Sequence, residues 1–217
     1  MNPAPLLRFR GLQPYEPIWR EMQCFTDERG EHSGDEIWFL EHPPVFTLGL
    51  NAAREHVLDA GDIPVVPIDR GGQVTYHGPG QLVVYPLIDL RRHPLGVRQL
   101  VMALEGAVIG YLQTLGVAAE ARRDAPGVYV EGRKIASVGL RIRRRCSYHG
   151  MALNVATDLA PFSRINPCGY RGLQVTRLCD LGGPADVSEV GHALAPFLLR
   201  SLGYSAINTA SEAVNSR

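Results

Sequence analysis

Residues 70–81 read RGGQVTYHGPGQ and lead directly into the strand-like residues Leu82–Leu90. Four glycines, a proline, an arginine and a histidine therefore lie between this strand and an earlier apolar run, Ile63–Ile68. Glycines this dense between strands let the backbone approach another group closely. Arg70, with the paired Gly71 and Gly72, can also offer N–H donors to a ligand. For the loop taken alone, a glycine-rich hairpin with an exposed arginine is the simpler interpretation.

The loop does not match the common phosphate-binding patterns. No Gly-Lys-Ser/Thr follows it, as a Walker A motif would need. A strand rather than a helix follows the glycines, unlike in the dinucleotide-binding G-x-G-x-x-G motif.

Apolar stripes at helical spacing predict three helices. The clearest covers Val97–Leu115, and Gly116 is well placed to stop it. A second begins at Asp186, which forms a capping-box pattern with Glu189. A third is expected over Glu16–Arg29. We assign the stripe of Val97–Leu115 to core packing, without a chemical role.

Most of the remaining chain is expected to form strands joined by tight turns. The turn His42-Pro43-Pro44 separates the first two strands, Gly132 predicts a hairpin, and residues 54–60 could form a short helix. Pro64 and Pro67 place the third strand at the edge of a sheet or at a bulge. The expected strands, besides Leu82–Leu90, are Glu36–Leu40, Val45–Leu48, Ile63–Ile68, Val117–Ala121, Gly127–Val130, Lys134–Arg143 and Tyr148–Val155.

This order of elements favours an α+β fold with a mixed, largely antiparallel sheet flanked by helices. We expect one domain over residues 1–217, with residues 207–217 as a frayed tail. Basic and acidic residues balance at 22 each, which argues against a nucleic-acid binder. No apolar run is long enough to span a membrane, and the first residues do not resemble a signal peptide. The four cysteines form no C-x-x-C pair, so we expect free thiols and a cytoplasmic protein.

Two residues could carry chemistry. Lys134 is the only lysine among the 22 basic residues, and lysine, unlike arginine, can lose its proton in a protein. Chance survival of one surface lysine is the alternative. Cys168 lies in a tight loop, Asn166-Pro167-Cys168-Gly169, and a nearby ammonium would raise its thiolate fraction. On the residues alone, a loop cysteine without a role is the simpler interpretation.

The histidines do not predict a metal site. His77 and His149 stand outside any H-E-x-x-H or Cys/His spacing, so histidines satisfied within a loop or strand are the expected outcome. We assign no role to Cys24, Cys146 and Cys179.

The stretch RGGQVTYHGPGQLVVYPLIDL resembles the signature of the lipoyl(octanoyl) transferases, within the biotin/lipoate protein ligase superfamily. Two later stretches, GRKIASVG at residues 132–139 and INPCGY at residues 165–170, match the same family in the same order. The resemblance covers the chain from about Glu41 to about Leu178. It implies the catalytic-domain fold of the biotin and lipoate ligases.

The resemblance also implies site residues. Cys168 matches the acyl-accepting nucleophile of the family and Lys134 its catalytic lysine, which together would form a dyad. Small residues near the acyl chain would leave room for it and offer N–H donors to an oxyanion. The family uses no metal and no cofactor. Its substrate-contacting positions correspond to Arg70, Gly71, Gly72, Gln73, Val74, Thr75, Tyr76, His77, Ser137, Val138, Gly139, Gly150, Met151 and Ala152.

The expected function is transfer of an octanoyl or lipoyl group from acyl carrier protein to a lysine of a lipoyl domain, through a Cys168 thioester. This is the first step of lipoate cofactor biosynthesis, and its acceptors would be the 2-oxoacid dehydrogenases and the glycine cleavage H protein. One alternative is an ATP-dependent lipoate or biotin ligase of the same fold. Another is a non-catalytic module that binds carrier proteins. The basic cluster of Arg141, Arg143, Arg144 and Arg145 is either a solvated strand edge or a dock for an acidic carrier.

Overall fold

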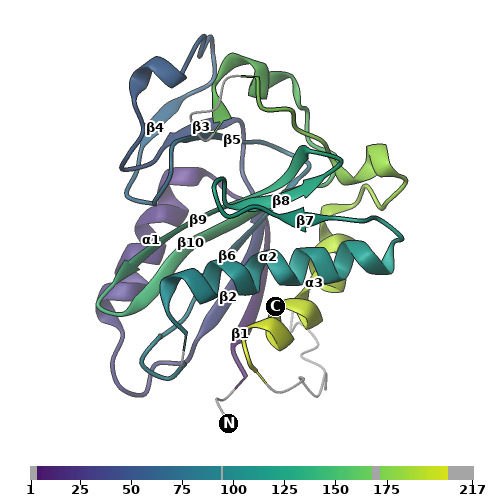
Figure 1. Ribbon diagram of the computed structural model, residues 1–217. Helices are drawn as coiled ribbons and strands as arrows, with labels where there is room; N and C mark the ends of the chain where they lie inside the picture. The colour runs from purple at the N-terminus through teal and green to yellow at the C-terminus, as the bar shows by residue number, and fades with distance from the viewer. Residues whose placement is uncertain (1–3, 94, 168–171, 205–217) are drawn as a thin grey trace, which may run out of the picture.

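A seven-stranded sheet carries most of the core in the computed structural model, which describes residues 4–93, 95–167 and 172–204 (Figure 1). The strands are β1 Leu6–Leu12, β2 Glu36–Glu41, β6 Gln81–Leu87, β7 Glu120–Ala121, β8 Gly127–Val130, β9 Arg133–Arg143 and β10 Cys146–Asn154. Their order across the sheet is β1-β2-β6-β10-β9-β8-β7. All pairs are antiparallel except β1 with β2. The predicted α+β fold with a mixed, largely antiparallel sheet is confirmed.

A second, three-stranded sheet lies beyond one end of the large sheet (Figure 1). It contains β3 Val45–Leu48, β4 Val65–Pro67 and β5 Val74–His77, with β3 in the middle. The prolines predicted β4 to be an edge strand or a bulge, and it is an edge strand. The turn at His42-Pro43-Pro44 also connects the two sheets, because the strands on its two sides belong to different sheets.

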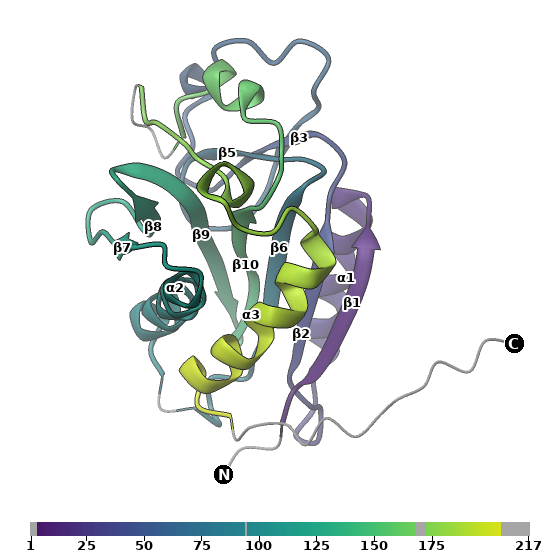
Figure 2. The same cartoon turned by 90° about the vertical axis from the view of Figure 1, so that its right-hand side faces the viewer.

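Three helices cover the two faces of the large sheet (Figure 2). α2 Val97–Thr114 and α3 Val187–Ser201 lie on one face, and α1 Tyr15–Glu28 lies on the other. The apolar stripe of α2 packs as predicted, since Leu100, Leu104 and Leu112 are fully buried in the main core. Burying each such leucine contributes about 2 kcal/mol.

The helix ends follow the sequence signals. Gly116 has φ +74°, the left-handed conformation of a helix stop, two residues after α2 ends. The Asp186 carboxylate accepts a hydrogen bond from the Glu189 N–H at 2.8 Å and so caps α3. Within the described residues, no helix has the length and apolar character to cross a membrane.

The β8–β9 hairpin determines where Lys134 lies. Glu131 and Gly132 have φ +49° and +78°, as a tight hairpin turn of the primed type needs. Lys134 follows this turn at the start of β9. Its N–H donates to Gln174 O at 2.8 Å, and its carbonyl accepts from the Thr176 N–H at 2.9 Å. Residues 174–176 therefore run beside Lys134.

Some local predictions need correction. β1 was not predicted, and only Glu120–Ala121 of the expected strand Val117–Ala121 pairs, as β7. Within residues 54–60, a 3-10 turn η1 covers only Arg54–His56. Two further 3-10 turns are η2 Ala160–Arg164 and η4 Leu178–Leu181. The proposed tail, residues 207–217, lies outside the described residues.

Candidate active site

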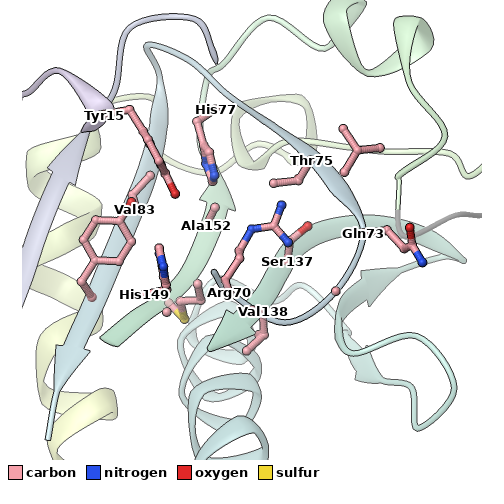
Figure 3. Close-up of a pocket in the computed structure, with 16 residues that line it drawn as sticks. Tyr15, Arg70, Gln73, Thr75, His77, Val83, Ser137, Val138, His149 and Ala152 are labelled. Carbon is pink, nitrogen blue, oxygen red and sulfur yellow. The ribbon is translucent and has the colours of Figure 1, made fainter. Parts of the chain in front are cut away.

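A pocket opens between the glycine-rich loop and the strands β6, β9 and β10 (Figure 3). Its empty space, which includes open solvent, amounts to about 510 Å³. Figure 3 shows Arg70 in the middle of the lining, with Tyr15 and His77 on one side and Gln73 and Ser137 on the other.

Twelve of the fourteen predicted substrate-contacting residues line this one pocket, although they come from three separate stretches of sequence. The two others do not. The N–H of Gly71 forms a hydrogen bond within the fold, to Leu140 O at 2.9 Å. The Tyr76 ring packs between Phe46 and Phe162. The lining residues are Arg70, Gly72, Gln73, Val74, Thr75, His77, Ser137, Val138, Gly139, Gly150, Met151 and Ala152.

Arg70 is buried, which corrects the interpretation of this loop as a hairpin with an exposed arginine. Its Nη2 donates to Thr47 O at 2.8 Å and to Thr47 Oγ1 at 2.9 Å, and its Nη1 donates to Gly71 O at 2.9 Å. The guanidinium fork thus joins the loop to β3 and fixes the loop over the pocket.

Sequence reasoning missed four lining residues: Tyr15, Val83, Tyr85 and His149. His149 was considered only as a metal ligand, although it directly precedes Gly150, and Tyr85 lies inside the family signature. Tyr15 comes from the start of α1, 55 positions before Arg70 in the sequence, so no local pattern connects it with the loop.

His149 is held by a carboxylate. Its Nε2 donates to Asp69 Oδ1 at 2.8 Å, and Trp19 and Tyr148 donate to the same carboxylate. Burial alone would raise the Asp69 pKa, but the hydrogen bonds from His149, Tyr148 and Trp19 hold it below its usual value. Burial lowers the pKa of His149 despite the Asp69 contact, so its ring is neutral at pH 7.

His149 and Gly150 form a strained point in β10. His149 has φ +55°, which is uncommon for a residue with a side chain and recurs at functional sites. A Cβ on Gly150 would lie 2.0 Å from Val84 O, so only glycine fits there. The close approach of strand β6 is therefore one reason for a glycine at position 150.

Met151 and Ala152 are also unsuited to the predicted oxyanion role. Both lie in β10 between β6 and β9 and are paired with both strands. Backbone groups inside a sheet are used by its ladder. These two residues contribute their side chains to the pocket.

A group of neutral histidines and tyrosines closes one end of the pocket. His42 Nδ1 donates to Gln13 O at 2.7 Å, and its Nε2 accepts from the Tyr85 hydroxyl at 2.8 Å. Burial lowers the pKa of His42 to about 4, and burial together with the His42 charge lowers that of His77 to about 3. In the part of the chain that the structure describes, no three His, Cys, Asp or Glu side chains are grouped closely enough to hold a metal ion.

Lys134 is buried, with 2% of its surface exposed, which corrects the alternative of a surface lysine. Its Nζ lies 5.4 Å from the centre of the Tyr129 ring, within cation–π range. A lysine is almost never buried to this extent without partners. Cys168 lies outside the described residues, so the Cys168–Lys134 dyad stays a prediction.

The arginine cluster lies far from Lys134. Arg144 and Arg145 have φ +49° and +62° and form the turn between β9 and β10, not a strand edge. Arg143 is nine residues along β9 from Lys134, a distance of about 30 Å. Arg143 also forms an ion pair with Asp27 at 3.0 Å, so part of its charge is compensated.

Comparison with known proteins places this chain in a family. Residues 13–198 match the lipoyl protein ligase A/B catalytic domain. The chain belongs to this family. Two relatives named octanoyltransferase are 59% identical in Alkalilimnicola ehrlichii, over 93% of this chain and 96% of the relative, and 60% identical in Methylococcus capsulatus, over 92% and 97%.

Solved structures share the fold at much lower sequence identity. A bipartite lipoate protein ligase from Thermoplasma acidophilum is 18% identical and superimposes with a TM-score of 0.73, over 95% of this chain and 86% of that one. At this identity the likeness concerns the fold alone.

Proposed function

We propose that this chain transfers octanoyl groups from acyl carrier protein to lysine side chains of lipoyl domains, the first step of lipoate cofactor biosynthesis. The observation that carries the proposal is the 59% identity to an octanoyltransferase over nearly the whole of both chains. Acceptors of matching chemistry are the lipoyl domains of 2-oxoacid dehydrogenases and the glycine cleavage H protein.

The span of the pocket lining along β9 and β10 is compatible with the length of an eight-carbon chain. Its lining runs along β9 and β10 from Ser137, paired with Ala152, to His149, paired with Leu140. These positions are three residues apart, or about 10 Å along a strand. An extended octanoyl chain, built from C–C bonds of about 1.5 Å, is about 9 Å long.

The first half-reaction would use Cys168, whose role rests on the INPCGY motif. Its thiolate attacks the carbonyl carbon of the octanoyl thioester and forms a new C–S bond. The phosphopantetheine thiolate of the carrier leaves and takes up a proton. A cysteine suits this step because a thiolate is both a good nucleophile and a good leaving group.

The second half-reaction would use Lys134 as a proton acceptor. The ε-amine of the acceptor lysine attacks the Cys168 thioester, an amide bond forms, and the Cys168 thiolate leaves. The attacking nitrogen must lose a proton, which neutral Lys134 can accept. In its ammonium form, Lys134 would instead stabilise the Cys168 thiolate of the free enzyme.

The fold alone does not separate a transferase from an ATP-dependent ligase, because lipoate protein ligases share it. A ligase would activate a free fatty acid as an acyl-adenylate and would not need Cys168. A non-catalytic carrier-binding module would form no product at all.

An ATP-free transfer assay tests the proposal. The purified chain is mixed with octanoyl acyl carrier protein and an unmodified lipoyl domain, and the mass of the lipoyl domain is followed. We expect one octanoyl group on the lipoyl domain without ATP, and none from free octanoate. Modification only with free octanoate and ATP would identify a ligase, and no modification under either condition would identify a binding module.

A further inference from the structure

Helix α2 carries one acidic residue, Glu105, on its buried side. The side chain is only 6% exposed, next to the fully buried Leu104 and two turns of apolar residues. A carboxylate in such a place is costly unless it is paired. The predicted stripe of α2 included its apolar neighbours and left Glu105 out.

The carboxylate of Glu105 has a defined partner. Its Oε1 accepts a hydrogen bond from the Gly127 N–H at 2.7 Å, at the first residue of β8. Figure 1 shows α2 crossing the sheet beside β8 and β9, which brings the helix to this point. The bond therefore fixes where the backbone of β8 begins.

Gly127 in turn lies against the side chain of Lys134. A Cβ built on Gly127 would stand 2.5 Å from Lys134 Cε and 3.2 Å from Lys134 Nζ. The Gly127 backbone, which Glu105 holds, is thus one wall of the space that contains the end of the lysine side chain.

Charge also links the two side chains. Burial raises the pKa of Glu105, while the Gly127 N–H and the positive charge of Lys134 lower it. In general, an anion favours the charged form of a neighbouring amine.

Other described groups also lie beside Lys134. The Tyr129 ring of β8 lies under Nζ, its hydroxyl donates to Ala125 O, and Arg122 lies over the same ring at 4.4 Å. The segment on the other side contributes the uncharged Gln174, Val175 and Thr176. Glu105 is the anion among these groups.

We propose that Glu105 is a positioning residue for Lys134, which holds the Gly127 wall in place and stabilises the ammonium form by its negative charge. The inference rests on the proposed function for its catalytic meaning. In the free enzyme this charge would favour the cation that the Cys168 thiolate needs. After acylation, it would set the pH at which Lys134 can accept the proton of the acceptor amine.

The single lysine of the chain allows a direct test. Protein labelled with ¹³C and ¹⁵N in lysine gives one side-chain signal, from Lys134, whose titration can be followed by NMR. The variant Glu105→Gln keeps an oxygen that can accept the Gly127 N–H but removes the charge. We expect its Lys134 titration to move to lower pH by about one unit, the low end of the effect of a nearby opposite charge.

Two further variants control for net charge and for structure. Glu28→Gln removes an exposed carboxylate from α1, on the other face of the sheet, and should leave the titration unchanged. Glu105→Asp keeps the charge but shortens the side chain. In Glu105→Asp, Lys134 should titrate at nearly the wild-type pH. The transfer rate should fall, because the shorter side chain holds the Gly127 N–H less firmly.

A kinetic measurement connects the titration to the reaction. The rate of octanoyl transfer from the isolated acyl-enzyme is followed against pH, and its acid limb in Glu105→Gln should shift by the same amount as the NMR signal. A Glu105→Gln titration that matches wild type, in protein folded by its amide spectrum, overturns the proposal and leaves the octanoyltransferase function intact. A shifted titration in a chain that transfers no octanoyl group would instead contradict the function and retain the Glu105–Lys134 coupling.

Discussion

Asp69 fixes the ring of His149: the Nε2–H donates to Asp69 Oδ1 at 2.8 Å, across 80 positions of sequence. The same carboxylate accepts hydrogen bonds from Trp19 of α1 and Tyr148 of β10. The Asp69 side chain, directly before the glycine-rich loop, therefore links helix α1, strand β10 and the pocket lining.

The variant Asp69→Asn should be destabilised by about 2 kcal/mol, because hydrogen bonds to a charged group are worth about 1.5–3 kcal/mol each and a neutral amide cannot satisfy three donors. Urea unfolding measures the change. Gln23→Ala, which removes a weaker contact to Asp69 at 3.2 Å, is the matched control and should cost under about 1 kcal/mol. Equal losses of unfolding free energy in Asp69→Asn and Gln23→Ala would show that the Asp69 hydrogen bonds stabilise the fold no more than one weak contact does.

Gly127→Ala should impair both folding and turnover. Gly127 has φ +140°, and a Cβ there would lie 2.4 Å from Ala136 O and 2.5 Å from Lys134 Cε. We expect a loss of more than about 1 kcal/mol in unfolding free energy and a fall of roughly tenfold to a hundredfold in kcat from displacement of Lys134. Gly106→Ala, in open space on α2, should gain about 0.5–1 kcal/mol and keep full activity. Normal kcat in Gly127→Ala would contradict the placement of Lys134.

The buried His77 predicts acid sensitivity. Its pKa of about 3 in the folded state, lowered by burial and then by the His42 charge, lies below the usual value of about 6.5 in the unfolded chain. Below about pH 6.5 the unfolded state therefore binds a proton that the folded state does not, and stability falls by about 1.4 kcal/mol per pH unit for this one group.

Urea midpoints between pH 7.5 and pH 5.5 should thus fall less steeply in His77→Asn than in wild type. The asparagine amide can still donate to Gln81 Oε1, the partner of His77 Nδ1 at 2.8 Å. His32→Asn, at an exposed histidine, should retain the wild-type slope. An unchanged slope in His77→Asn would mean that His77 does not stay neutral in the fold.

Charge reversal tests the arginine cluster as a dock for the carrier. Because about 30 Å of β9 separates Arg143 from Lys134, we expect Arg143→Glu with Arg144→Glu to leave KM for octanoyl carrier protein nearly unchanged at low and high salt. A KM that rises several-fold at low salt and loses its salt dependence would support docking at this turn.

Sequence patterns predicted the elements whose signals lie within a few neighbouring residues. The stripe of α2, the Asp186 cap and the Gly132 hairpin each depend on residues within a few positions of one another, and the structure contains all three. The prolines of β4 predicted an edge strand or a bulge for the same reason, since a proline has no N–H to donate to a ladder.

Contacts between distant segments determine the features that the sequence patterns did not predict. β1 was missed because its exposed Leu6 and Leu12 do not alternate cleanly with buried positions. The split into two sheets at Pro43-Pro44 depends on which strands β2 and β3 pair with. The motifs brought most of the pocket lining together, but Tyr15 and Glu105 reach their places only through folding.

The most direct test of the central claim is the mass of the enzyme after brief exposure to octanoyl acyl carrier protein without an acceptor. We predict one octanoyl group per chain, removed by hydroxylamine, on the tryptic peptide that contains Cys168, and no such group on a Cys168→Ala variant. An octanoyl group on Cys179 instead, or continued transfer to a lipoyl domain by Cys168→Ala, would contradict a reaction through Cys168.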